Sequence, residues 1–296
     1  MKIALITLYN PEREVVSHVS SIVNQVDKVY LCDNSPHNNA SMFSEIEKVN
    51  YLFYNSNLAL SGAFNRVLCD PKIDFQDEDY ILFFDQDSFV EDGHVQKLIH
   101  EYDRLTSLGY QVGCIGPLYF DRNTKAVRIP KVKKKIDCNT FIVDNNITSS
   151  LLCQYGHLRK IGFWNEDIFL DMADWDLCWR FMYAGMLCFR TSATLLSHTV
   201  GNGEKKLGVI RILHGAPIRE YYQTRNYLSL LRKPYTPLRF RARFVLCLTI
   251  RPIGHLIILD KKFERLYYVT KGYSDFFNRI HSEYKGKREP ISEKRL

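Results

Sequence analysis

Residues 80–88 read YILFFDQDS, an apolar run that stops at Asp85 and places a second carboxylate at Asp87. A short run of this kind, rich in aromatic and β-branched residues, is typical of a buried strand. The two acidic side chains then lie at the end of that strand, with Gln86 between them. Two carboxylates held this close repel each other unless a cation joins them. The stretch therefore predicts a buried sheet with a metal site at its edge, and a turn with two capping carboxylates is the alternative.

The segments before this strand alternate between two periodicities. Strand-like runs at 3–9, 28–35 and 49–57 each end in polar residues, and helix-like runs lie at 12–26 and 61–69. This alternation predicts an α/β fold with a mainly parallel sheet flanked by helices, and residues 112–152 add further strands and loops. Open α/β sheets bind ligands beyond the carboxyl ends of their strands. We therefore expect one edge to carry Asn10, Asp33, Asn34, Asn57 and Asp85.

Length and composition exclude several classes of protein. The chain has 296 residues, of which 46% are hydrophobic, so it can bury a full core and is not expected to be disordered. None of its eight cysteines forms a C-x-x-C pair, which predicts small buried residues rather than a zinc ribbon. The sequence contains neither a signal peptide nor the ~18 apolar residues of a membrane span. We expect a cytoplasmic protein.

A second acidic cluster occurs in EDIFLDMADWDLCWR, residues 166–180. Asp176 and Arg180 are four residues apart, so on a helix that opens near Asp174 they are predicted to form an ion pair. Asp174 is then the freer carboxylate. Its apolar neighbours Trp175 and Trp179 favour a raised pKa, which suits a general base that accepts a proton from a substrate hydroxyl.

Two basic positions are further candidates for the site. His198 precedes Gly201 and Gly203, and an imidazole there could ligate a metal or contact phosphates; the alternative is a hydrogen-bonded loop residue. Arg225 lies in a run predicted to be helical over 210–233, where its planar guanidinium could pair with a diphosphate. The alternative for Arg225 is an exposed helix face.

Several of these motifs follow one another in a recognisable order. They are DNS at 33–35, FFDQDS at 83–88, DWDLCWR at 174–180, and HTVGNG at 198–203 followed by PIREYYQTRNY at 217–227. Together they resemble the family 2 glycosyltransferases, and more narrowly the bacterial rhamnosyltransferase-like group, over about residues 1–235. The resemblance implies a GT-A fold for 1–235, with a nucleotide-binding half over about 1–110 and an acceptor half over about 111–235. Residues 236–296 are predicted to form a basic amphipathic helical extension.

The resemblance also implies roles for individual residues in an inverting transfer that uses Mg²⁺ or Mn²⁺. Asp174 corresponds to the catalytic base, and Asp87 and His198 to metal or diphosphate contacts. The implied donor-binding residues are Thr7, Tyr9, Asp33, Asn57, Asp85 and Arg225, and the implied acceptor-binding residues are Ser149, Ser150 and Trp175. The sequence departs from the family pattern at Leu58, where glycine is usual, and at Ala173, where glutamate is usual.

The expected reaction is transfer of a sugar from a nucleotide-sugar donor to a saccharide or lipid-linked acceptor in bacterial surface polysaccharide synthesis, such as O-antigen or capsule. The resemblance favours dTDP-rhamnose over UDP- and GDP-sugars. A nucleotidyltransferase acting on sugar phosphates is one alternative, although Asn10-Pro11-Glu12 stands where its glycine-rich loop is expected. A carbohydrate-binding module without enzymatic activity is another.

The C-terminal part of the chain carries much of the net charge of +7. Residues 239–259 mix arginines with Phe, Leu and Ile, which predicts peripheral contact with the inner face of the cytoplasmic membrane. A helix packed on the catalytic domain and a homodimer interface are the alternatives. We expect no nucleic-acid partner.

Overall fold

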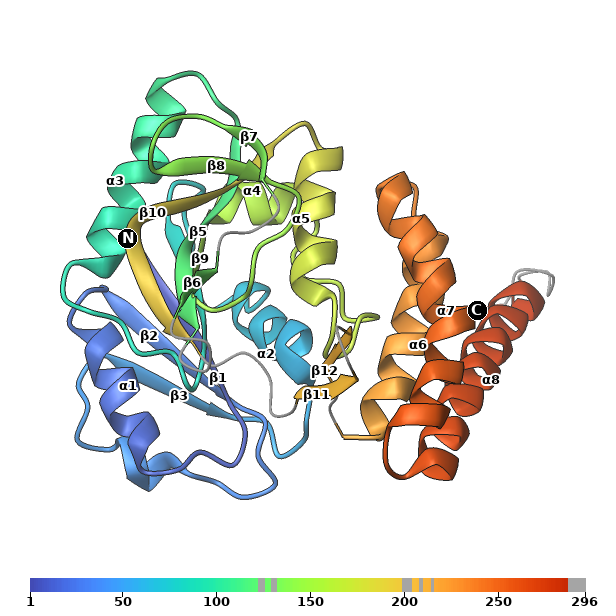
Figure 1. The fold of residues 1–296 in the computed structure, drawn as a ribbon. Helices are drawn as coiled ribbons and strands as arrows, with labels where there is room; N and C mark the ends of the chain where they lie inside the picture. The colour runs from blue at the N-terminus through green and yellow to red at the C-terminus, as the bar shows by residue number, and fades with distance from the viewer. Residues whose placement is uncertain (122–125, 129–131, 199–203, 208–209, 214–215, 287–296) are drawn as a thin grey trace, which may run out of the picture. The chain divides into compact units, whose positions relative to one another are not determined.

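The computed structural model describes residues 1–121, 126–128, 132–198, 204–207, 210–213 and 216–286 (Figure 1). The chain divides into two compact units, Met1–Val200 and Gly201–Leu296. The sequence instead placed the end of the catalytic region near residue 235, and that boundary stays a prediction.

The strands of the first unit form one large sheet. Its order is β3-β2-β1-β4-β9-β5-β10-β8-β7, with β6 paired to β5. The N-terminal strands β1, β2, β3 and β4 are parallel to their neighbours among themselves, as predicted. Their bounds are Lys2–Leu8, Lys28–Asp33, Val49–Phe53 and Tyr80–Asp85.

The other half of the sheet is mixed. Strand β9 runs antiparallel to both β4 and β5, and β5 is parallel to β10. Strands β7 and β8 continue the sheet in antiparallel fashion. These strands are β5 (Val112–Asp121), β6 (Ala126–Arg128), β7 (Val132–Lys135), β8 (Thr140–Val143), β9 (Leu151–Gln154) and β10 (Leu187–His198). The parallel strands are therefore mostly β1 to β4, whose carboxyl ends carry the polar residues predicted to form a binding site.

Helices cover both faces of this sheet (Figure 1). The alternation of side chains along β4 shows why: Leu82 and Phe84 pack in one core with helices α1 (Glu14–Val23) and α3 (His94–Ser107). Phe83 points to the opposite face, where its ring lies 4.8 Å from that of Phe64 on α2. The helices on that face are α2 (Ala59–Leu68), α4 (Tyr155–Lys160) and α5 (Ala173–Tyr183), and a short 3₁₀ helix spans Ala40–Phe43.

A buried histidine ties three segments of the first unit together. The His94 side chain at the start of α3 is fully buried, and its Nε2 lies 2.6 Å from Ser150 Oγ. Its Nδ1 lies 2.7 Å from Thr194 Oγ1 on β10. Burial lowers the pKa of His94 to about 4, so the imidazole stays neutral at physiological pH.

This histidine makes stability depend on pH in a predictable direction. Because the pKa of His94 is lower in the folded chain, its contribution to the unfolding free energy is present above the unfolded pKa of about 6.5 and is lost as pH falls towards 4. We expect the stability difference between wild type and His94→Gln to narrow by about 3 kcal/mol from pH 7 to pH 4. Urea unfolding at both values measures this. The exposed His37→Gln is the control, and equal pH dependence in all three proteins would contradict the prediction.

Among its described residues, the second unit contains a hairpin and three helices. The hairpin pairs β11 (Glu204–Leu207) with β12 (Ile210–Leu213), and the helices are α6 (Ile218–Leu231), α7 (Leu238–Ile258) and α8 (Lys262–Gly286). The sequence predicted a helix from residue 210, which is wrong for Ile210–Leu213. Ile210 and Ile212 alternate with Arg211, a strand pattern that pairs with the preceding strand.

Close packing holds these helices together. A Cβ atom on Gly272 of α8 would lie 2.9 Å from Tyr221 O and from Thr224 Cβ of α6, so only glycine allows this approach. The ring of Phe244 on α7 stacks on Tyr227 of α6 at 4.6 Å. None of the described helices combines the length and the apolar character needed to cross a membrane.

Candidate active site

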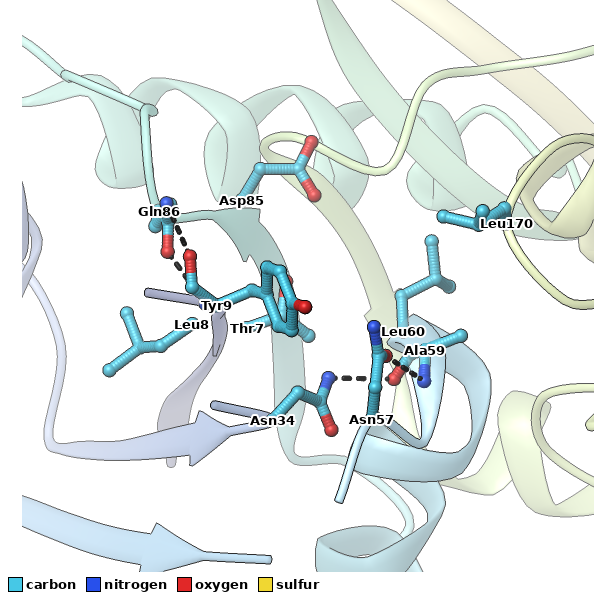
Figure 2. Close-up of a pocket in the computed structure, with 10 residues that line it drawn as sticks. All are labelled: Thr7, Leu8, Tyr9, Asn34, Asn57, Ala59, Leu60, Asp85, Gln86 and Leu170. Carbon is cyan, nitrogen blue, oxygen red and sulfur yellow. Dashed lines mark hydrogen bonds between the residues drawn. The ribbon is translucent and has the colours of Figure 1, made fainter. Parts of the chain in front are cut away.

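A pocket of about 430 Å³ lies at the carboxyl ends of the four parallel strands (Figure 2). Its lining comes from the ends of β1 and β4, the residues that follow β2 and β3, the start of α2 and the loop before α5. The lining residues are Thr7, Leu8, Tyr9, Asn34, Asn57, Ala59, Leu60, Asp85, Gln86 and Leu170. The crevice is therefore where the topology of an open α/β sheet predicts it.

Two asparagines fix the start of α2 beside the pocket. Asn34 accepts a hydrogen bond from the Leu58 N–H at 3.1 Å and donates one to Ala59 O at 3.0 Å. Asn57 Oδ1 accepts from the Ala59 N–H at 2.9 Å. Ala59 has φ 53°, in the left-handed region, and these bonds offset the cost of that backbone conformation.

Gln86, between the two carboxylates of the D-x-D stretch, binds the end of β1. Its Oε1 accepts from the Tyr9 N–H at 2.8 Å, and its Nε2 donates to Tyr9 O at 3.3 Å. The backbone of Gln86 is also fixed in place, because its carbonyl oxygen lies 3.0 Å from Nδ1 of His18 on α1. This pairing keeps the ends of β1 and β4 in one arrangement and positions Asp85.

The Asp85 carboxylate faces the pocket from the end of β4 (Figure 2). Ser149 donates a hydrogen bond of 2.5 Å to its Oδ2. Ser149 is almost fully buried, and its neighbour Ser150 is fully buried and bonded to His94. In the structure these two serines therefore support Asp85 and the core. Their predicted part in acceptor binding stays a prediction.

Asp174 lies in the first turn of α5. Its pKa is raised to about 7, mainly by burial and to a smaller extent by the Asp85 carboxylate, while the Trp175 N–H and Arg190 act in the opposite direction. Because Asp85 lines the pocket, this effect shows that Asp174 interacts electrostatically with a carboxylate of the pocket lining. A carboxylate that titrates near neutral pH is suited to accept a proton from a substrate.

The second carboxylate of this helix, Asp176, forms the ion pair with Arg180 that the sequence predicted. Asp176 is buried and accepts a 2.7 Å hydrogen bond from Arg180 Nε, four residues further on. It also accepts one of 3.2 Å from Asn165 Nδ2. The Trp175 ring contacts that of Trp179 edge to face, with centroids 6.0 Å apart.

Two other predicted site residues, Asp33 and Asp87, are not among the residues that line this pocket, and their roles stay predictions. Asp33 is fully buried, where it accepts hydrogen bonds from the Ser35 N–H, Asn39 Nδ2 and the Tyr51 hydroxyl and does not line the pocket. Asp87 is exposed beyond the strand end.

The two basic candidates belong to other parts of the chain. The backbone of His198 ends β10, but its side chain lies outside the described residues. Arg225 is on α6 of the second unit, where its guanidinium lies 5.6 Å from the ring centroids of Tyr221 and Tyr222. The roles assigned to both stay predictions.

The structure adds lining residues that the sequence did not single out. The amide of Gln86 has no obvious metal or acid–base chemistry, and its place between the two carboxylates of D-x-D is the signal in the sequence that could identify it. Leu60 and Leu170 carry no local signal, since an apolar residue next to a helix start resembles any core residue. Only the packing of α2 and the loop before α5 reveals them.

Comparisons with known proteins agree on the fold and on the family. Residues 4–159 match the model of glycosyl transferase family 2. A curated protein of Shigella flexneri, dTDP-rhamnosyl transferase RfbF, is 25% identical over 280 residues, which cover 90% of this chain and 91% of that protein.

Two solved structures have a similar fold. The structure of S. aureus TarS 1-349 has a TM-score of 0.59 at 12% identity, and the match covers 93% of this chain and 79% of that one. The structure of GalNAc-T7 with UDP, GalNAc and Mn2+ has a TM-score of 0.54 at 11% identity and covers 82% of this chain. The present chain spans 54% of GalNAc-T7. These likenesses confirm the predicted GT-A fold. Because the family model matches more than half of the sequence, the chain is a glycosyltransferase that belongs to glycosyl transferase family 2.

Proposed function

We propose that this enzyme transfers rhamnose from dTDP-rhamnose to a saccharide or lipid-linked acceptor in the synthesis of a bacterial surface polysaccharide, with inversion at the anomeric carbon. The observation that carries the proposal is the pocket at the strand ends, with Asp85 on its lining and Asp174 within electrostatic reach. The similarity to a dTDP-rhamnosyl transferase along almost the whole chain supports the choice of donor.

The pocket residues suit a nucleotide donor. Tyr9 is half exposed at the mouth, where its ring offers a stacking surface for a base. Thr7 and Asn57 present polar groups at neighbouring strand ends, and Asp85 can accept hydrogen bonds from ribose hydroxyls. This arrangement orients the diphosphate towards the end of β4.

The side chains at the end of β4 fit a divalent cation. The carboxylates of Asp85 and Asp87 are hard oxygen ligands of the kind that Mg²⁺ and Mn²⁺ prefer, and Ser149 fixes one of the two. Asp87 is exposed and is available to bind an ion together with donor phosphates and water. Such an ion, when bound, neutralises charge on the departing diphosphate.

Asp174 is the proposed general base. Its carboxylate accepts the proton of the acceptor hydroxyl as that oxygen attacks the anomeric carbon and the bond to the diphosphate breaks. Attack from the face opposite the leaving group inverts the linkage. Burial near the pocket gives Asp174 the basicity that this step needs at neutral pH.

A donor panel tests the proposal. The purified enzyme is incubated with dTDP-rhamnose, UDP-glucose and GDP-mannose in Mn²⁺ or in EDTA, and release of the nucleoside diphosphate is measured. We expect release from dTDP-rhamnose in Mn²⁺ at a rate at least tenfold above that from the other donors. Preference for another donor would refute the rhamnosyl assignment, and metal-independent release would refute the role of the ion.

The hydrogen bond from Ser149 predicts a donor-side defect. Ser149→Ala leaves the Asp85 carboxylate without its 2.5 Å partner. Because a hydrogen bond to a charged group contributes about 1.5–3 kcal/mol, we expect dTDP to bind about tenfold more weakly or worse in the presence of Mn²⁺. Calorimetric titration measures the change. Ser107→Ala, at an exposed position on α3, is the control, and unchanged affinity in both variants would contradict the prediction.

We further propose that α7 attaches the enzyme peripherally to the inner face of the cytoplasmic membrane. Leu246, Ile250, Ile253 and Ile257 recur at helical spacing and are 55–70% exposed, while Phe244 and Leu248 pack inward. Exposed arginines begin the same helix, at Arg239 and Arg243. Apolar residues beside basic ones suit an interface with anionic lipid.

Vesicle flotation tests this attachment. We expect the wild type to float with vesicles containing phosphatidylglycerol but not with pure phosphatidylcholine, and Ile250→Glu/Ile253→Glu to remain in the soluble fraction. The exposed Leu108→Glu on the first unit is the control. Equal flotation of the wild type and the double variant would contradict the proposal, as would loss of a dimer instead of loss of lipid binding.

A further inference from the structure

A buried arginine, Arg190, interacts electrostatically with Asp174 and uses only part of its hydrogen-bonding capacity. Arg190 on β10 is 4% exposed. Its Nε donates a 2.8 Å hydrogen bond to Asn146 Oδ1, and its guanidinium carbon lies 5.6 Å from the centroid of the Tyr119 ring. Within the part of the chain that the structure describes, its two terminal nitrogens donate no hydrogen bond. Neither nitrogen is a fully buried atom that lacks a hydrogen-bond partner, so both reach solvent-accessible space.

The partner of Arg190 Nε is itself held rigidly. Asn146 Nδ2 donates to Phe189 O at 3.0 Å, and the Asn146 N–H lies 3.3 Å from Cys178 Sγ. Gly116 makes room for it, since a Cβ atom there would lie 3.1 Å from Asn146 Oδ1. The guanidinium plane is therefore oriented by the protein before any ligand binds.

The surroundings of Arg190 do not cancel its charge. The sulfur atoms of Cys114, Cys178 and Cys188 gather within 4.8 Å of one another, and the Arg190 charge interacts with Cys114 and Cys178. Burial raises the pKa of the Cys178 thiol well above its usual value, so that thiol is neutral at physiological pH. The carboxylate within electrostatic reach is Asp174, and the described residues show no salt bridge between the two.

The terminal N–H groups of Arg190 reach accessible space while the rest of the side chain is buried, so a ligand can complete their hydrogen bonds. Those N–H groups form a planar fork that matches the two oxygens of a phosphate or a carboxylate. We propose that Arg190 binds an oxyanion carried by the acceptor, on the Asp174 side of the active site.

The assignment to the acceptor rests on the proposed function, because Asp174 marks the acceptor side only if it is the general base. A phosphate near the reducing end of a lipid-linked saccharide and the carboxylate of an acidic sugar both present the required oxygens. An oxyanion held here would bring the neighbouring hydroxyl of the acceptor to the Asp174 carboxylate. Arg190 would then determine acceptor specificity.

Binding of two simple oxyanions tests the inference. The full-length enzyme is saturated with dTDP and Mn²⁺, and methyl phosphate and the methyl glycoside of glucuronate are each titrated into it by calorimetry. We expect one of the two to bind, and Arg190→Gln to weaken that binding by about 10- to 100-fold with dTDP affinity unchanged. Preference for methyl phosphate would indicate an acceptor that carries a phosphate, and preference for the glucuronate glycoside would indicate an acidic sugar.

Two further variants keep the result interpretable. Arg190→Lys retains the charge without the fork and should bind the probe with intermediate affinity. Arg159→Gln removes an exposed arginine that pairs with Asp77 and should behave as wild type. Failure of both probes to bind the wild type, equal binding by Arg190→Gln, or loss of dTDP affinity in that variant would each overturn the inference. Full transfer activity in Asp174→Asn would instead refute the proposed function while leaving the binding result intact.

Discussion

Replacing Asp174 with asparagine is expected to lower the rate of sugar transfer by a factor of about 10²–10⁴, because the amide has the shape of the carboxylate but cannot accept the proton of the acceptor hydroxyl. Binding of dTDP and Mn²⁺ should be unchanged, since the pocket proposed to hold the donor is lined by other residues. Steady-state transfer kinetics and nucleotide titration measure the two effects. Asp171→Asn, three residues earlier in the same acidic cluster, is the matched control.

The pH dependence of the wild type provides a second measurement of the same role. A base must be deprotonated to act, and the pKa of Asp174 is raised to about 7. Activity should therefore rise with pH through about 7 and be lost on the acid side. Arg190 lowers this pKa, so its removal in Arg190→Gln should move the acid limb to higher pH. A profile that is flat between pH 5 and 8, or an Asp174→Asn enzyme with wild-type turnover, would remove Asp174 from the proposed mechanism.

Replacing Asp87 with alanine is expected to reduce metal-dependent transfer by about 10²–10³-fold, because the ion that neutralises the departing diphosphate loses an oxygen ligand. The exposed position of Asp87 makes a large loss of stability unexpected, so thermal unfolding should change little. Activity measured against Mn²⁺ concentration shows the effect as a weaker apparent affinity for the ion. EDTA should abolish transfer by the wild type, and excess Mn²⁺ should restore it.

Asp92 offers a matched control for this experiment, because it is also an exposed aspartate shortly after the end of β4. Asp92→Ala should keep wild-type activity and the same dependence on Mn²⁺. If Asp87→Ala responded to Mn²⁺ as the wild type does, the ion would have to be held by other residues. The assignment of the D-x-D stretch as the metal site would then be wrong.

Much of the N-terminal half of the sheet could be predicted from local pattern. The run ending at Asp85 forms β4, and Asn34, Asn57 and Asp85 meet at one pocket as the strand-end argument expected. The Asp176–Arg180 pair followed from helical spacing alone. These features depend on neighbours within one element or on the topology of an α/β sheet, both of which periodicity reveals.

Adjacent residues show where local pattern is insufficient. Asp33 is the last residue of β2 and Asn34 follows it, so the two look equally suited to a binding site. Asp33 is hydrogen-bonded to Asn39 and Tyr51, however, while Asn34 lines the pocket. Similarly, Ile210–Leu213 adjoins a helical run, and local pattern therefore predicts a helix there, whereas the segment forms strand β12. Pairing with Glu204–Leu207, rather than propensity, decides that segment.

The sequence by itself determined the α/β architecture, the order of its motifs and the positions of the two carboxylates that we propose for metal binding and proton transfer, Asp87 and Asp174. Tertiary structure alone decided that Ser149 holds Asp85, that Asp174 lies within the field of Asp85, and that Arg190 is buried beside Asn146 with its terminal nitrogens unused. The physical reason is that periodicity specifies which face of an element is buried. The partners that meet across elements are set by how those faces pack, and burial and electrostatic interactions depend on that packing.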